Sequence, residues 1–308
     1  MKILIVLLLS LLLTACSAPP AQEAQDPPEA PVEQELPAEQ PAAPQQTPVE
    51  FPAAPQEQGI RYEADTTLFA DTLYAEDGTQ LLHYEIHIPY LSAYREDGTE
   101  ITEVQTPKEE QALAAVQTFN DRFAVWHSEE AIREAAKLAA DDLSWYQEEQ
   151  MDWYGGYWME LNCTIYQTEH LISISGVYAA HTGGAHPNAY LLGWNFDPHS
   201  GVFFGAEGLA GHTELQEAVA AEIIRQAQER AAESELAPEE FFWPEYESII
   251  ADWPSYAVSF DENGMKVAFS PYELAAYAAG AQEFILPYEF LADYLDEPAQ
   301  ITLGLTSE

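Results

Sequence analysis

Basic residues are scarce in this sequence of 308 residues, which holds 10 lysines and arginines against 53 aspartates and glutamates. The formal net charge of −43 repels DNA, RNA and anionic lipid surfaces, which excludes nucleic-acid binding as a function class. The same charge favours encounter with basic partners, or it serves solubility alone. Composition leaves both interpretations open.

Cysteine is nearly absent, since Cys16 and Cys163 are the only two. If Cys16 is modified as described below, Cys163 is the single remaining thiol and no intramolecular disulfide can form. No basic or histidine-rich neighbour lies beside Cys163 in the sequence, so nothing indicates an activated nucleophile there.

Long hydrophobic runs are also missing. The longest, from Ile3 to Leu13, has eleven apolar or small residues, which is too short to span a bilayer and is typical of a signal peptide. The residues before Cys16 match a bacterial lipobox, which predicts a signal peptide over residues 1–15 and lipidation of Cys16. The expected location is the extracytoplasmic face of the cell membrane. An ordinary secretory signal with a chance cysteine is the alternative.

Residues 16–58 have too little apolar bulk to fold. From Ser17 to Gln58 the sequence holds eleven of the 21 prolines, eight acidic residues and no lysine or arginine. Such a composition cannot offset its ordering entropy and cannot form a regular helix or strand ladder. We expect a disordered tether.

The rest of the chain alternates strand and helix signals. Two strand-like runs flank Asp77-Gly78, and Asn263-Gly264 is a second strong hairpin signal. Thr106 with Glu109 forms a capping box, with Pro107 in the first helical turn. This order predicts an α+β fold of antiparallel sheets with packed helices. We expect two small subdomains, residues 59–180 and 181–308.

Two stretches could carry chemistry but have a simpler structural interpretation. His83, Glu85 and His87 share one face of a strand and could ligate zinc, although a solvated polar face is favoured. Six aromatic residues between residues 145 and 158 could form a platform for sugars, although core packing is favoured.

The stretch HTGGAHPNAY, residues 181–190, is the most distinctive. A metal site at His181 and His186 would need further ligands that their spacing does not supply. A backbone interpretation explains more residues, because Gly183-Gly184 permits positive φ and Pro187-Asn188 can tighten the entry into the next strand. We therefore expect no cofactor and no metal.

Two separated segments resemble one known family. They are YAAHTGGAHPNAYLLGWNFDPHSGVFF, from Tyr178 to Phe204, and VAFSPYELAAYAAGAQEFILPYEFL, from Val267 to Leu291. Together they are similar to the RsiV-like (DUF3298) extracytoplasmic domain, with a DUF4163-type N-terminal part. This domain occurs in lysozyme-sensing anti-sigma factors and before the catalytic domain of some peptidoglycan deacetylases.

The resemblance implies a non-catalytic, ligand-binding domain on a membrane-anchored lipoprotein. Its implied partner is a basic protein of the lysozyme type or peptidoglycan, and not a nucleic acid. The implied contact residues are His186, Pro187, Asn188, Tyr272, Glu273 and Tyr277. Gly280, like Gly183 and Gly184, is expected to shape a turn. The alternative is a cell-wall glycan hydrolase or other envelope enzyme that uses His181 and His186.

Overall fold

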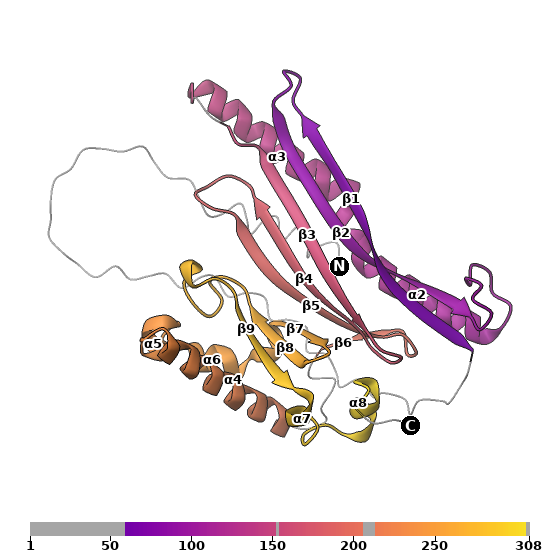
Figure 1. Ribbon diagram of the computed structural model, residues 1–308. Helices are drawn as coiled ribbons and strands as arrows, with labels where there is room; N and C mark the ends of the chain where they lie inside the picture. Colours follow the sequence, from indigo (N-terminus) through magenta and orange to yellow (C-terminus); the bar gives the residue numbers. More distant parts are fainter. Residues whose placement is uncertain (1–58, 152–153, 206–212, 306–308) are drawn as a thin grey trace. The chain divides into compact units, whose positions relative to one another are not determined.

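The computed structural model describes residues 59–151, 154–205 and 213–305 (Figure 1). The signal peptide, Cys16, the tether and Trp153 of the aromatic stretch lie outside the described residues. No helix in the described part is long and apolar enough to cross a bilayer.

Nineteen helices and strands follow one another in the described residues. In chain order they are β1 (Ile60–Tyr74), β2 (Gln80–Arg95), α2 (Pro107–Ala124), η1 (Val125–His127), α3 (Glu129–Glu148), β3 (Tyr157–Gln167), β4 (Ile172–His181), β5 (Asn188–Asp197), β6 (Val202–Phe204), α4 (Thr213–Glu233), α5 (Pro238–Phe241), α6 (Tyr246–Ala251), η3 (Trp253–Ser255), β7 (Ala257–Asp261), β8 (Gly264–Phe269), η4 (Tyr277–Ala279), β9 (Gln282–Pro287), α7 (Tyr288–Leu291) and α8 (Glu297–Thr302). Helices and strands are mixed along the chain, so the α+β class is confirmed.

The first sheet has six strands in the order β1-β2-β3-β4-β5-β6 (Figure 1). One pair departs from the antiparallel arrangement that the sequence predicts: β2 and β3 are parallel, with Leu82 opposite Tyr157. The cause is the connection between them. Helices α2 and α3 carry the chain back to the start of β2, as a crossover does, whereas a short turn would have reversed its direction.

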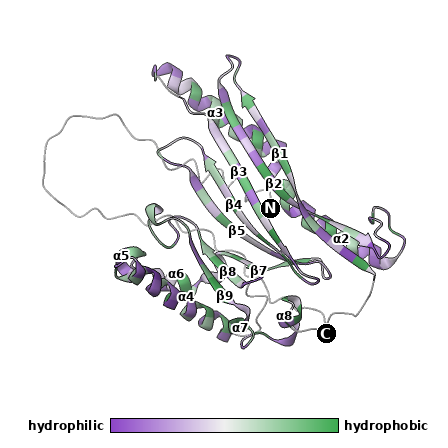
Figure 2. Cartoon of the chain, viewed as in Figure 1, coloured by the Kyte–Doolittle hydropathy of each residue, from purple (hydrophilic) through white to green (hydrophobic). Residues whose placement is uncertain are grey.

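Alternation along β2 decides which face of this sheet is covered. Leu82, Ile86 and Ile88 are buried, on the side where α2 and α3 run along the strands (Figure 1). Figure 2 shows hydrophobic and hydrophilic residues alternating along β1 and β2. The opposite side of β2 carries His83, Glu85 and His87, as a half-buried strand requires.

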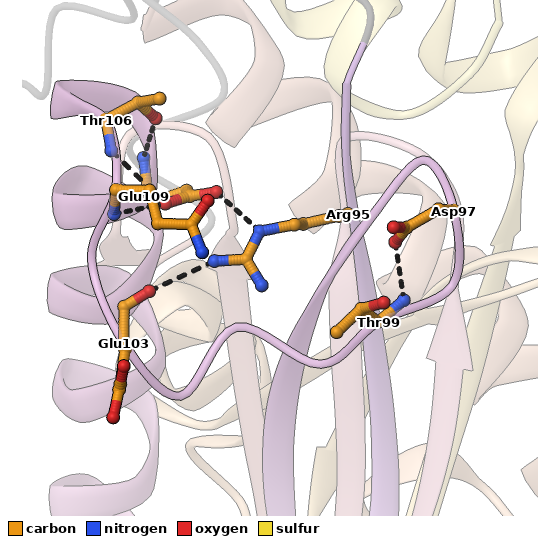
Figure 3. A network of polar contacts seen from close by, with 7 residues as sticks. Arg95, Asp97, Thr99, Glu103, Thr106 and Glu109 are labelled. Atoms are coloured by element: carbon orange, nitrogen blue, oxygen red, sulfur yellow. Dashed lines mark hydrogen bonds and ion pairs between the residues drawn. The ribbon is translucent and has the colours of Figure 1, made fainter.

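Helix α2 begins with the capping box that the sequence predicts. The Glu109 backbone N–H donates to Thr106 Oγ1 at 3.3 Å, and the Thr106 N–H donates to the Glu109 carboxylate at 3.2 Å (Figure 3). Arg95, at the end of β2, adds an ion pair of 2.7 Å to the same carboxylate and donates to the Glu103 carbonyl oxygen at 3.0 Å (Figure 3). Glu109 therefore links the helix start to the neighbouring strand.

Glu109 gives a pH-dependent prediction. The hydrogen bond from Arg95 lowers the pKa of the Glu109 carboxyl, with smaller contributions from the Gln105 and Thr106 N–H groups. A carboxyl whose pKa is lower in the folded state stabilises the fold above its unfolded pKa, and this contribution is lost as pH falls through the folded pKa. Glu109→Gln should lower the melting temperature at neutral pH, by an amount that shrinks on acidification. Thermal unfolding over a pH series measures it.

The matched control is Glu110→Gln, which removes an exposed carboxylate from the same helical turn. Its melting temperature should stay close to that of the wild type at every pH. A Glu109→Gln difference that is constant down to acid pH would contradict the assignment.

The second sheet has three antiparallel strands in the order β7-β8-β9. Its first hairpin forms as the sequence predicts, but the turn lies one residue earlier than Asn263-Gly264. Asp261 pairs with Gly264, so Glu262 and Asn263 form the turn and Gly264 begins β8. Trp253, Phe269 and Phe284 are at most 1% exposed and belong to the core between this sheet and its helices. The same core includes Leu171, which precedes β4, and Phe204 of β6. The boundary that we predict between the two subdomains, after residue 180, lies near the end of β4. Strands β5 and β6, which follow it, belong to the first sheet, and the second sheet begins at residue 257.

The two sheets meet through buried polar side chains and through Gly193 of β5, which lies against Val258 of β7. Ser173 and Asn195 are 1% and 2% exposed, and the Ser173 hydroxyl is 2.8 Å from Asn195 Oδ1. The Asn195 amide donates to the Val258 carbonyl at 3.0 Å, and the Phe260 N–H donates to Ser173 Oγ at 2.6 Å. These bonds satisfy β7 backbone groups that would otherwise be buried without partners. Asn195, part of the stretch that carries the family resemblance, therefore has a structural role.

Candidate functional site

The distinctive stretch HTGGAHPNAY forms the loop between β4 and β5. Gly183 and Gly184 have φ of 88° and 90°, a region that side chains with a Cβ rarely adopt. His181, the last residue of β4, has its Nε2 atom 3.3 Å from the Gly184 carbonyl oxygen. The glycines turn the chain so that His186 and Pro187 come next to a distant segment.

That segment follows β8 and contains the tyrosines of the second family-like stretch. The ring of Tyr277 stacks on the ring of His186, with centroids 3.9 Å apart and planes 20° apart. The Tyr277 hydroxyl donates to the Pro187 carbonyl at 3.0 Å, and the Tyr272 hydroxyl lies 3.2 Å from His186 Nε2. We call His186, Tyr272 and Tyr277 the aromatic site. The structure thus joins the two sets of residues that the resemblance implies.

The proton positions within the aromatic site follow from the partners. His186 Nδ1 lies 3.0 Å from the Pro187 carbonyl oxygen, which can only accept, so Nδ1 carries the proton. In the neutral ring, Nε2 is then an acceptor for the Tyr272 hydroxyl. Both ring nitrogens of His186 are therefore engaged in holding the cluster together.

Tyr272 has an unusual backbone. Its φ is 75°, in the left-handed region that is strained for a bulky residue, and its side chain is 54% exposed. Two hydrogen bonds hold it: Trp243 Nε1 donates to the Tyr272 carbonyl at 3.0 Å, and the Tyr272 N–H donates to the Ala275 carbonyl at 3.1 Å. The surrounding structure therefore imposes a costly conformation on a ring that stays half in solvent.

Glu273 follows Tyr272 in the chain and is half-buried, whereas Tyr272 is exposed. Burial raises the pKa of its carboxyl, partly offset by hydrogen bonds from Ser270, whose N–H donates to the carboxylate. The Leu191 N–H donates to Ser270 Oγ at 3.0 Å, which ties this turn to β5. Glu273 stabilises the turn that carries Tyr272.

The remaining residues implied by the resemblance lie beside the aromatic site. Asn188 begins β5 and is paired with Ala180, and the described contacts give its side chain no bond to the three rings. Gly280 ends η4 with a φ of 71°, and its N–H donates to the Tyr277 carbonyl at 2.9 Å. These two residues position the backbone on either side of the cluster.

Two supporting residues could not be identified from the sequence. Trp243 reaches Tyr272 from the segment between α5 and α6, and Ser270 joins Glu273 to β5. Trp243 carries no local signal, and the bond between Ser270 and Leu191 joins residues far apart in the chain. Only the position of Ser270, three residues before Glu273, hints at a turn.

Two residues of the aromatic stretch have structural roles, whereas Trp145 of the same stretch is 52% exposed. Tyr157 is 4% exposed and donates to Asp142 at 2.7 Å, which holds β3 against α3. The Tyr154 hydroxyl donates to the Ala139 carbonyl at 2.7 Å, which holds the segment before β3 against the same helix. Among the described residues, no three His, Cys, Asp or Glu side chains are placed to hold a metal ion.

The segments that form the aromatic site contain no basic residue. The sequence has no lysine or arginine between Lys137 and Arg225, and none after Lys266. The first interval supplies β3, β4, β5 and the glycine loop, and the second supplies the segment with Tyr272 and Tyr277. None of these segments contains a basic side chain, and β3, β5 and the segment with Tyr272 each contain an acidic one.

Comparison with solved structures shows the same fold elsewhere. A crystal structure of a DUF3298 family member from Bacteroides fragilis NCTC 9343 matches with a TM-score of 0.55 and 15% identity, over 80% of this chain and 98% of that one. A DUF3298 family protein from Pseudomonas aeruginosa PAO1 matches with a TM-score of 0.46 and 13% identity, over 78% of this chain and 96% of that one. At these identities the first likeness shows the fold alone.

None of the curated proteins matches this chain. A family model, described as "Protein of unknown function (DUF3298)", matches residues 206–289. This range includes the second sheet and the aromatic site tyrosines, Tyr272 and Tyr277. The chain therefore carries a DUF3298 domain over residues 206–289, as its resemblance predicts.

Proposed function

We propose that this protein is a non-catalytic receptor whose aromatic site binds a basic protein of the lysozyme type outside the cell. The observation that carries the proposal is Tyr272, a half-exposed ring held at a φ of 75°. Strained backbone persists only where the surrounding structure holds it, and such residues cluster at binding and catalytic sites.

The aromatic site has the composition of a binding anchor. Tyrosines bury a large area on binding at a small cost in side-chain entropy, and they are enriched among the residues that dominate interface energies. Stacking on His186 and the bond to Pro187 fix Tyr277 before any ligand arrives. A preorganised ring loses less entropy when a ligand orders it.

The charge distribution favours a basic partner. A lysine or arginine of the partner could lie over the exposed face of Tyr272, where cation–π attraction adds to the long-range field of the acidic chain. A neutral wall glycan would gain nothing from this field. Peptidoglycan is therefore the less favoured ligand.

The hydrogen bonds of the aromatic site support binding in preference to catalysis. His186 uses both ring nitrogens on Pro187 and Tyr272, and Tyr277 uses its hydroxyl on Pro187. A general base needs a free nitrogen within reach of the proton that it removes. The assignment of Cys16 as a lipid anchor, which would hold the domain at the membrane, is part of the same proposal.

The test is a calorimetric titration of the purified domain, residues 59–308, with a c-type lysozyme at low and moderate salt, together with a lysozyme inhibition assay. We expect saturable binding that weakens as salt rises, because screening reduces the attraction between opposite charges. Absence of heat and of inhibition at both salt concentrations would contradict the lysozyme form of the proposal.

A further inference from the structure

The face of the first sheet opposite α2 and α3 is partly uncovered. The second sheet contacts this face at β4 and β5, through Ser173 and Asn195. On β1 and β4 it leaves apolar side chains in solvent: Leu68 is 52% exposed and Val177 is 43% exposed.

Strand register places charged and aromatic side chains together on this uncovered face. His83 is opposite Trp158, and Glu85 is opposite Glu160 on the parallel strand β3. On the other side of Trp158 lies His181 of β4, whose ring is stacked on Trp158 with centroids 6.5 Å apart. The hydrogen bond of 2.9 Å between Thr72 and His83 confirms that β1 presents the same face. We call Leu68, His83, Glu85, Trp158, Glu160 and His181 the open strand face.

The open strand face continues into the aromatic site. His181 ends β4 and contacts the Gly184 carbonyl oxygen in the same loop that presents His186 to Tyr277. The loop therefore has the His186–Tyr277 stack near one end and the His181–Trp158 stack at the other. A protein ligand that covers the aromatic site can reach the open strand face without leaving the surface.

Among the described contacts, neither Glu85 nor Glu160 pairs with a lysine or arginine. Like charges on directly opposite strand positions are unfavourable, and Glu85 has only His83 Nε2 nearby, at 3.3 Å. The two arginines of the β1–β2 hairpin, Arg61 and Arg95, lie at its other end. Strands β3 and β4 have no lysine or arginine at all. The missing counter-charge is what a basic protein would supply.

We infer that the open strand face is a second contact region of the receptor, where Glu85 and Glu160 together take a lysine or arginine side chain of the bound protein. This inference rests on the proposed function, because it extends the same interface. Two adjacent acceptors on a rigid sheet suit one cationic group better than a single mobile carboxylate does. Trp158 and Leu68 would flank that group with apolar surface.

The test compares two double variants that change the net charge equally. Glu85→Gln/Glu160→Gln removes the pair, whereas Asp121→Asn/Glu134→Gln removes two exposed carboxylates from α2 and α3 on the opposite face. Each is titrated with a c-type lysozyme and, separately, with a hexalysine peptide. We expect the first variant to lose about three- to tenfold in affinity for lysozyme, with a weaker salt dependence, and the second to bind like the wild type.

Each other outcome decides a different point. Equal losses in both double variants would show an effect of overall charge and would overturn the inference. Full affinity of Glu85→Gln/Glu160→Gln for lysozyme would overturn it too, while the proposed function stands. If the wild type fails to bind lysozyme, the proposed function fails. Hexalysine binding that is lost only in Glu85→Gln/Glu160→Gln would still support a cation site at these two residues. Hexalysine binding that is unchanged in this variant would reject that site.

Discussion

Replacement of Gly193 by alanine is expected to destabilise the protein by about 3 kcal/mol or more, the upper range for overpacking a buried site. A Cβ atom at this position would lie 2.3 Å from the Val258 carbonyl oxygen and 2.6 Å from its nitrogen. Both are backbone atoms of β7, so no side chain can rotate to make room. The strand itself would have to move away from β5.

Movement of β7 would break more than one contact. Asn195 and Ser173 hold β7 by hydrogen bonds to Val258 and Phe260, and both of these residues belong to the core. Groups that lose partners while buried cost about 1–3 kcal/mol each. The clash therefore spreads through the junction between the two sheets.

Denaturant unfolding, followed by tryptophan fluorescence, measures the effect. Gly184→Ala is the control, because a Cβ there meets nothing within 4 Å and only the φ of 90° is unfavourable. It should cost clearly less than Gly193→Ala. If Gly193→Ala unfolds at the same midpoint as the wild type, the close approach of β7 to β5 is wrong.

Local signals predicted the elements that depend on short-range chemistry. Thr106 and Glu109 form the capping box that the sequence predicts. Both predicted hairpins form, the first with its turn at Asp77-Gly78 and the second with its turn at Glu262-Asn263, one residue earlier than predicted. Each depends on residues a few positions apart. The aromatic and histidine residues implied by the family resemblance also come together, although nothing local in the sequence shows that they meet.

The parts that could not be predicted depend on contacts between distant residues. The parallel pairing of β2 with β3 follows from how α2 and α3 pack, which no turn signal reports. Gly193 lies within a strand, and nothing in the sequence distinguishes it from other strand glycines. Only the structure shows that the backbone of Val258 packs against it. The positive φ of Tyr272 contradicts the usual preference of its residue type and is imposed by Trp243 and Ala275.

Tyr272→Gly should lower the affinity for a basic protein ligand by roughly 10- to 100-fold, as loss of an interface anchor does. Its effect on folding should be small. Glycine relieves about 1–2 kcal/mol of left-handed strain. Two losses oppose this gain: the unfolded chain with glycine has more entropy, and the folded protein loses a ring that is 54% exposed and packs only in part. The free energy of unfolding should stay within about 1 kcal/mol of the wild type. Affinity and stability would then respond separately to one substitution.

The most direct test of the aromatic site is a side-by-side calorimetric titration of the wild type, Tyr272→Gly and Trp145→Ala with a c-type lysozyme at moderate salt. Trp145 is 52% exposed on α3, outside both proposed contact regions, and so serves as the matched exposed aromatic. We predict that Trp145→Ala binds as the wild type does and that Tyr272→Gly, equally well folded, binds far more weakly. Equal affinities of all three proteins would contradict a ligand site at Tyr272.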